Sequence, residues 1–154
     1  MPITMRDVRA WLDPDEVDYV NAKKLGPGAI PFLMELVQGG DLGLASKATY
    51  LASLIGSEQS AAVLEAAVAR NEPVLRVAAA SAMRNLPEVR AHRVLDLLRN
   101  DPDVGVRKVL LKSAVRFSSP QMVAKLRQMA ETDPEPFVRE MAAGNVKEME
   151  RKKK

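Results

Sequence analysis

Three basic residues recur at every fourth position in the second half of the chain: Lys108, Lys112 and Arg116. On a helix this spacing places their side chains on one stripe, which faces away from the apolar side chains of Val106 and Leu110. A stripe of cations that faces solvent attracts acidic groups on a partner. The candidate chemistry is therefore electrostatic recognition rather than bond making.

The residues that catalysis and metal binding require are mostly missing. The chain has no cysteine and a single histidine, His92, which excludes thiolate nucleophiles and zinc sites built on cysteine. It contains no glycine-rich phosphate loop, no His-Glu-x-x-His and no Gly-x-Ser-x-Gly elbow. The acidic run at 13–18 does not fit the glycine and glutamate spacing of an EF-hand loop. His92 stands between Arg90 and Arg93, and we expect it to be a solvated surface residue. We predict a protein that is not an enzyme and carries no cofactor and no metal.

Length and composition indicate one soluble domain. The chain has 154 residues, of which 47% are hydrophobic, 28% are charged and only 4% are aromatic. Alanine and leucine fill the segments between clusters of glycine and proline, which favours helices over strands. No apolar run approaches 18 residues and no apolar segment follows the first residues. We expect an all-α, cytoplasmic protein without membrane contact.

The chain repeats itself with a period of about 31 residues, which is the signature of an array. Two sets of apolar positions carry the period, and within each unit they recur at helical spacing. Each unit is therefore predicted to hold a first and a second amphipathic helix. The sets are Leu33, Leu64, Leu95 and Leu126 for the first helices, and Leu44, Leu75, Val106 and Val138 for the second helices.

The period divides residues 1–150 into a cap and four units that form a single domain. The cap, residues 1–26, is predicted to contain a helix at 7–12 and a second helix that starts at 13–16 and ends near 25. Its Trp11 and Tyr19 are predicted to be apolar lids on the open end of the stack. The four units are 27–56, 57–86, 87–118 and 119–150, and 151–154 is a basic tail expected to fray.

Three segments resemble HEAT repeats, in the short form found in phycobilisome-lyase-like repeat proteins: 73–83, 101–111 and 133–143. Each has a Val or Leu followed by an arginine in the same register, and the resemblance covers about residues 26 to 150. It implies a right-handed α-solenoid of about four helix pairs, with first helices on a convex side and second helices lining a concave surface. Tetratricopeptide and ankyrin repeats fit less well, because their signature residues are absent.

The resemblance also implies a structural ladder between adjacent units. In the family, an aspartate six residues before the repeated arginine commonly joins such a ladder. Carried over to this chain, the ladder contains Asp101 with Arg107 and Asp133 with Arg139, and Arg76 is the equivalent arginine one unit earlier. These residues are expected to be structural rather than to touch a ligand.

Two positions depart from the family pattern at the N-terminal end. Ala45 stands where the first unit should have its arginine, and Arg70 stands where the second unit should have its aspartate. The N-terminal units are therefore expected to be looser or specialised. We also expect the Arg107 pair to be partly exposed, so that solvent screens it.

The charge is distributed unevenly along the chain. Residues 1–76 carry a net charge of −3 and residues 77–154 a net charge of +6. The basic stripe does not continue into the neighbouring second helices. Its equivalents are Val77, Ser81 and Asn85 in the second unit, and Glu140, Gly144 and Glu148 in the fourth. A second basic set lies on the predicted first helices: Arg90, Arg93, Arg99, Lys125 and Arg127.

We therefore predict a non-catalytic adaptor or scaffold, with a monomer favoured, that binds an acidic or amphipathic protein segment on its second-helix surface. The predicted contacts are Lys108, Lys112, Arg116, Ser81 and Asn85. The alternative is a nucleic-acid-binding module that uses the basic C-terminal half together with residues 151–154. A lyase or glycosylase of a HEAT-like family is less favoured, because the residues for such activities are not found.

Overall fold

The computed structural model describes residues 2–152, and within that range the chain forms helices and no strands. The all-α prediction is confirmed. The α-helices are α1 (Met5–Leu12), α2 (Tyr19–Ala22), α3 (Ile30–Val37), α4 (Leu42–Ile55), α5 (Ser60–Ala69), α6 (Pro73–Ala82), α7 (Glu88–Leu98), α8 (Val104–Ala114), α9 (Pro120–Thr132) and α10 (Pro136–Lys152). Short 3₁₀ turns occur at η1 (Lys23–Leu25), η2 (Pro27–Ala29) and η3 (Met83–Asn85).

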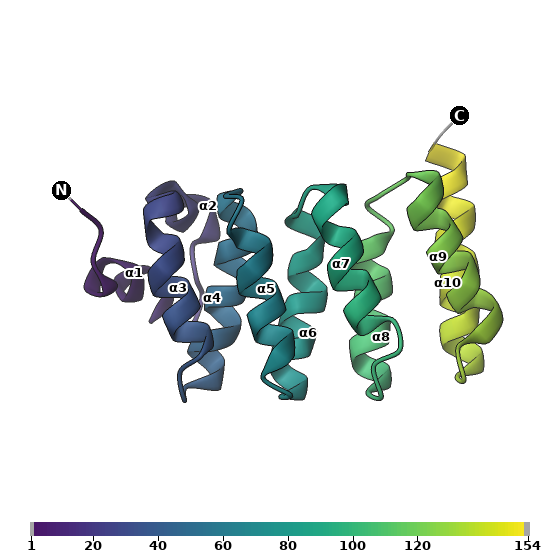
Figure 1. Cartoon of the computed structure of the whole chain (residues 1–154), viewed down its shortest axis with the longest axis horizontal. Coiled ribbons are helices and arrows are strands. Elements are labelled where there is room, and N and C mark those ends of the chain that lie inside the picture. Colours follow the sequence, from purple (N-terminus) through teal and green to yellow (C-terminus); the bar gives the residue numbers. More distant parts are fainter. Residues whose placement is uncertain (1, 153–154) are drawn as a thin grey trace.

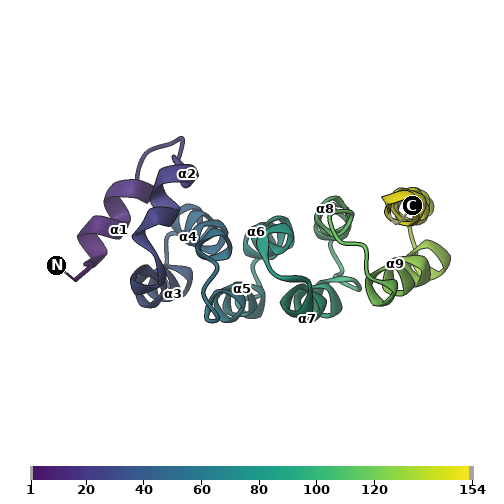
Figure 2. The ribbon, with the colours of Figure 1, turned by 90° about the horizontal axis from the view of Figure 1, so that it is seen from above.

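From α3 onward the helices follow one another along the long axis of the molecule (Figure 1). Seen from above, α3, α5, α7 and α9 form one layer and α4, α6, α8 and α10 form the other (Figure 2). In the second layer, α4 contacts α6, α6 contacts α8, and α8 contacts α10. The chain therefore alternates between the layers, and most contacts join segments that are close in sequence.

The core lies between the two layers and is built from the repeating apolar positions. Leucine fills each of the four first-layer positions, and all four side chains are fully buried. The second-layer positions are buried as well. The side chains are Leu33, Leu64, Leu95 and Leu126 in the first layer and Leu44, Leu75, Val106 and Val138 in the second. Burying one such side chain contributes about 1.5–3 kcal/mol, so the 31-residue pattern accounts for much of the stability.

The helices begin and end at residues whose side chains or backbone suit those positions. The side chains of Asp41, Asp103 and Ser119 accept hydrogen bonds from N–H groups in the first turns of α4, α8 and α9, at 3.0, 2.7 and 3.1 Å. Glu72 precedes α6 without such a bond. Gly56 ends α4 in the left-handed region, with φ +75°, where a side chain would be strained.

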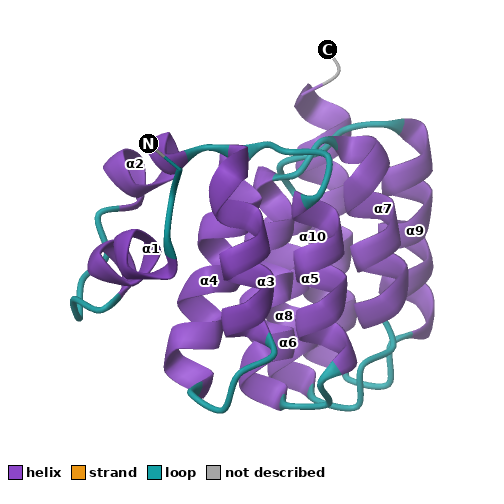
Figure 3. Cartoon of the chain, turned by 60° about the vertical axis from the view of Figure 1, so that its left-hand side comes forward, coloured by secondary structure: helices purple, strands orange, loops and turns teal. Residues whose placement is uncertain are grey.

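The second helix of the cap begins later than the sequence predicts. Residues 13–16 do not start a helix, and α2 begins only at Tyr19. The reason is the position of the capping group, since the carboxylate of Asp18 accepts a hydrogen bond from the N–H of Asn21. Figure 3 shows α1 and α2 standing beside the end of the two layers, and α1 contacts α3 and α4.

The side chains that close this end differ from those predicted. Val8 and Leu12 of α1 are fully buried, whereas Trp11 is 37% exposed. Tyr19 is half-buried and packs against Tyr50. The prediction of Trp11 as a lid was wrong, because the helical phase of α1 turns Val8 and Leu12 toward the core instead.

The C-terminal segment is more ordered than a fraying tail. α10 continues to Lys152, so Arg151 and Lys152 belong to a helix, and Met149 is fully buried. Lys153 and Lys154, the remainder of the predicted tail, lie outside the described residues.

Candidate partner-binding surface

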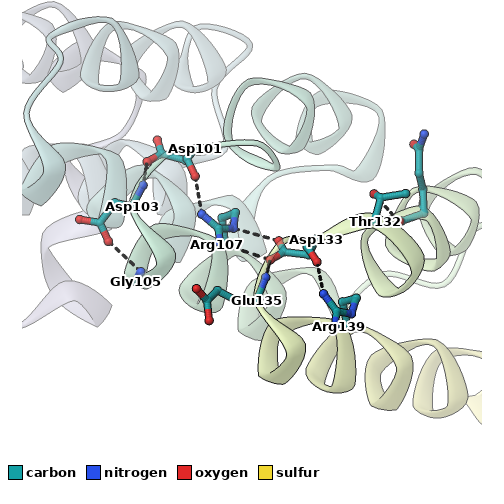
Figure 4. A network of polar contacts seen from close by, with 9 residues as sticks. Asp101, Asp103, Gly105, Arg107, Thr132, Asp133, Glu135 and Arg139 are labelled. Carbon is teal, nitrogen blue, oxygen red and sulfur yellow. Dashed lines mark hydrogen bonds and ion pairs between the residues drawn. The ribbon is translucent and has the colours of Figure 1, made fainter.

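Arg107 holds the third and fourth units together through a buried, two-pronged ion pair. Its Nε and Nη2 donate to the two carboxylate oxygens of Asp133 at 2.9 and 3.2 Å, and its Nη1 donates to the main-chain oxygen of Asp101 at 2.6 Å (Figure 4). Arg107 and Asp133 are each only 5% exposed. The expectation of a partly exposed pair was wrong, because the loops before α8 and α10 cover it.

Parts of the same contact recur in the neighbouring units. Arg76 Nε donates to the Asp101 carboxylate at 2.7 Å. Arg139 Nη1 donates to the main-chain oxygen of Asp133 at 2.6 Å. Each ion pair thus joins an arginine to the aspartate of the following unit. The predicted pairings of Asp101 with Arg107 and of Asp133 with Arg139 are made through main-chain oxygens, not through carboxylates.

A different contact replaces the ladder at the N-terminal end. Arg70 Nη1 donates to the main-chain oxygen of Val37 at 3.0 Å and to that of Gly39. These carbonyls lie at the C-terminal end of α3, where the helix leaves acceptors unsatisfied. The first unit has Ala45 where the repeated arginine would stand, and Arg70 of the second unit links the two units instead.

A further set of polar bonds joins the helices of the second layer. Ser113 Oγ donates to the main-chain oxygens of Ala80 and Ser81 at 2.5 and 3.1 Å. Asn145 Nδ2 donates to the main-chain oxygen of Leu111 at 2.7 Å. We did not predict these bonds. The sequence did contain a signal for them. Ser113 and Asn145 are polar, whereas the equivalent core positions in the first and second units are the apolar Leu51 and Ala82.

The basic stripe lies on the outward side of the second layer. Lys112 and Arg116 are exposed, and within residues 2–152 no carboxylate oxygen lies within 4.0 Å of either side chain. Lys108 is half-buried, with its ammonium 4.8 Å from the centre of the exposed Phe137 ring. Two full positive charges are therefore free to meet a partner.

Arg116 follows α8 rather than lying on it. The helix ends at Ala114, and the Arg116 N–H donates to the Ser113 oxygen at 3.2 Å in a tighter turn. Close by, Lys152 Nζ donates to the main-chain oxygen of Val115 at 2.9 Å. The C-terminal end of α8, where the helix dipole favours cations, therefore carries positive charge from two helices.

The two polar residues predicted beside the stripe have different surroundings. Ser81 is half-exposed, and its main-chain oxygen accepts from Arg84 as well as from Ser113. Asn85 lies in η3, where its Nδ2 donates to Ser53 Oγ of α4 at 3.0 Å. Asn85 thus connects two elements of the fold, whereas Ser81 faces a surface hollow.

That hollow, which we call the tyrosine pocket, opens over α4 and α6. It has a volume of about 360 Å³ and is lined by Tyr19, Ser46, Lys47, Tyr50, Ala78 and Ser81. The two tyrosine rings meet edge to face, with centroids 5.0 Å apart and planes at 64°. Burial raises the pKa of Tyr19, and the neighbouring Tyr50 raises it further, so the phenol is uncharged at neutral pH. The pocket therefore offers aromatic and aliphatic surface.

The basic residues of the first layer, by contrast, are mostly paired. Arg93 meets Glu65 at 2.6 Å and Lys125 meets Asp96 at 3.0 Å. Arg99 donates to Gln128 at 2.9 Å, and Arg127 pairs with Glu150. Of the five predicted members of this patch, Arg90 alone has no polar partner in the described chain. The charge of this layer is largely neutralised within the protein.

Other features of the described chain bear on chemistry. His92 is half-buried, and its Nδ1 is buried without a hydrogen-bond partner, so the prediction of a solvated histidine was wrong.

Across residues 2–152, no three histidine or carboxylate side chains gather in a way that could hold a metal ion. In the same range, no helix is both long enough and apolar enough to cross a bilayer.

Another hollow, of about 510 Å³, lies at the ladder, between the loops before α8 and α10. Arg107 lines it, but its donors are already engaged by Asp101 and Asp133. The ladder therefore supports the second layer and leaves its outward side, with the basic stripe and the tyrosine pocket, as the candidate surface.

Comparison of the chain with protein-family models, with curated proteins and with solved structures found no match.

Proposed function

We propose that the chain is a non-catalytic adaptor, built as a HEAT-like right-handed α-solenoid, that binds an acidic segment of a partner protein on the outward side of its second layer. The repeated helix pairs and the repeated arginine contacts support the architecture. In such arrays the stacked helices present an extended binding surface.

One observation carries the proposal: two cations of the basic stripe are exposed and unpaired, whereas most of the basic set on the other layer is paired. Lys112 and Arg116 are exposed without a carboxylate partner in the described chain, whereas Arg93, Lys125 and Arg127 of the other layer are each paired. A surface that keeps its cations unpaired retains the electrostatic attraction that steers an acidic partner.

The nucleic-acid alternative has weaker support. It draws on the basic C-terminal half, but three basic residues of that half, Arg93, Lys125 and Arg127, are paired with Glu65, Asp96 and Glu150. Within residues 2–152, the one aromatic ring found stacked against a cation is that of Phe137, over Lys108. Proteins that bind single-stranded nucleic acids commonly stack several rings on the bases.

The test is affinity purification from the native host, followed by calorimetric titration with the identified partner. Lys112→Glu combined with Arg116→Glu should weaken binding at least tenfold. Arg90→Glu combined with Arg127→Glu changes the net charge equally, but on the other layer, and should leave the affinity within about twofold of wild type.

Equal losses in both double variants would contradict the proposal, since binding would then follow net charge alone. Gel-shift titrations with duplex and single-stranded DNA at about 50 mM salt test the alternative, because non-specific nucleic-acid binding is visible at such salt. A shift that weakens steeply with salt would favour the nucleic-acid function instead.

A further inference from the structure

The tyrosine pocket and the basic stripe occupy the same repeat positions on different helices. Subtracting 31 residues from Lys108 and Lys112 gives Val77 and Ser81 on α6, and subtracting 62 gives Ser46 and Tyr50 on α4. Ser46, Tyr50 and Ser81 line the pocket. Because repeat positions face the same way on successive helices of one layer, the pocket and the stripe share one face.

The chemistry of this face changes along the layer. At the α4 and α6 end it offers two tyrosine rings and the methyl group of Ala78, around a hollow of about 360 Å³. At the α8 end it offers the free charges of Lys112 and Arg116, with Lys152 close by. The one ammonium at the pocket, that of Lys47, already donates to the oxygens of Leu12 and Pro14 at 3.0 and 2.8 Å.

We infer that this face recognises a protein segment with two parts, an aromatic or proline residue that enters the tyrosine pocket and a run of acidic residues that lies over Lys112 and Arg116. This inference rests on the proposed function and names the partner that fits it. Ring-on-ring contacts suit an apolar anchor, and the unpaired cations complement carboxylates.

The distance between the two ends fixes the spacing within the partner. α4 and α8 are two helices apart in their layer (Figure 2), and packed helices lie about 8–10 Å from axis to axis. The span is therefore about 16–20 Å, which an extended chain covers in about five or six residues, at roughly 3.3–3.6 Å each. The anchor and the first acidic residue should be separated by about that number.

The test is to pan a phage-displayed library of random 12-residue peptides on the purified full-length protein, and to measure the affinity of the enriched peptides by fluorescence anisotropy. Ala78→Gln fills the pocket without adding charge, and Ser81→Gln does the same from the next turn of α6. The matched control is Ala62→Gln on α5, which is exposed on the other layer. Circular dichroism verifies that each variant is folded.

The inference predicts peptides with an aromatic or proline residue about five or six positions from an acidic run. A pocket-filling variant should weaken them at least tenfold, and Ala62→Gln should not. Acidic peptides without an anchor, insensitive to both pocket variants but weakened by Lys112→Glu with Arg116→Glu, would overturn the inference and leave the proposed function standing. Peptides without acidic residues, or no enrichment at all, would overturn both.

Discussion

Arg107 forms the buried ion pair at the junction between the third and fourth units. It satisfies both oxygens of Asp133 and the main-chain oxygen of Asp101, and all of these groups are buried. Replacing Arg107 with alanine leaves the Asp133 carboxylate buried without its cation. The loss of one partner of a buried pair costs about 3–5 kcal/mol, so Arg107→Ala should destabilise the protein by that amount in urea unfolding.

The matched control is Arg93→Ala. Arg93 also pairs with a carboxylate of a neighbouring helix, but its side chain is 69% exposed, and an exposed pair contributes about 0–1 kcal/mol. If the two variants unfold at the same urea concentration, the ladder does not carry the stability assigned to it here.

At the residue scale, the sequence predicted which residues form the ladder better than it predicted the atoms through which they bond. The register placed Arg76, Arg107 and Arg139 at equivalent positions, but it could not tell which oxygen of each aspartate accepts, because that depends on how the loops fold back. The prediction that Trp11 is buried as a lid was wrong for a related reason. The Thr4 and Asp7 pair fixes where α1 begins, but the face of a short helix that is buried depends on the elements it packs against, here α3 and α4.

The helices of the second layer begin with acidic residues that are equivalent in register but differ in their bonds. Asp103 accepts from the Gly105 N–H at 2.7 Å, whereas Glu72, 31 residues earlier, makes no capping bond. An N-cap side chain contributes about 0.5–2 kcal/mol. Asp103→Ala should therefore destabilise the protein by about 1 kcal/mol, and Glu72→Ala by clearly less, as thermal unfolding measures.

Equal effects of these two substitutions would mean that the acidic residues act through general attraction to the helix dipole rather than through a specific bond. Asp41→Ala provides a second comparison, since Asp41 accepts from the Leu44 N–H at 3.0 Å and should behave like Asp103→Ala.

At the element scale, the all-helical class and the buried positions of the repeat followed from periodicity, because burial repeats with the pattern. The start of α2 and the length of α10 did not. Asp13, Asp15 and Asp18 are all acceptable N-caps, so composition alone could not select Asp18. In α10, the buried Met149 stands among the charged residues 147, 148 and 150–152, and this run of charge predicts a fraying end rather than a continued helix.

For the whole molecule, contacts between neighbouring units predict how a central lesion spreads. Leu95 is fully buried in α7, whereas Leu97, two residues later on the same helix, is 43% exposed. Leu95→Ala should destabilise by about 2–5 kcal/mol through lost burial and a cavity, and Leu97→Ala by much less.

The shape of the transition adds information. If stability is a sum over neighbouring units, Leu95→Ala should broaden the thermal transition or split it between the two ends of the chain. A single transition as sharp as that of the wild type, merely shifted to lower temperature, would contradict the array account. An unchanged midpoint would contradict the 31-residue register itself.

The central claim is that acidic segments bind the outward side of the second layer. The most direct measurement is a nuclear magnetic resonance titration of the ¹⁵N-labelled protein with a deca-glutamate peptide at low salt. The account predicts amide shifts at Lys108–Arg116 and at the C-terminal turn of α10, with α5 and α7 unchanged, and predicts that these shifts vanish in the Lys112→Glu and Arg116→Glu double variant. Shifts centred on Arg90, Arg93 and Arg99, or none at peptide concentrations in the millimolar range, would contradict it.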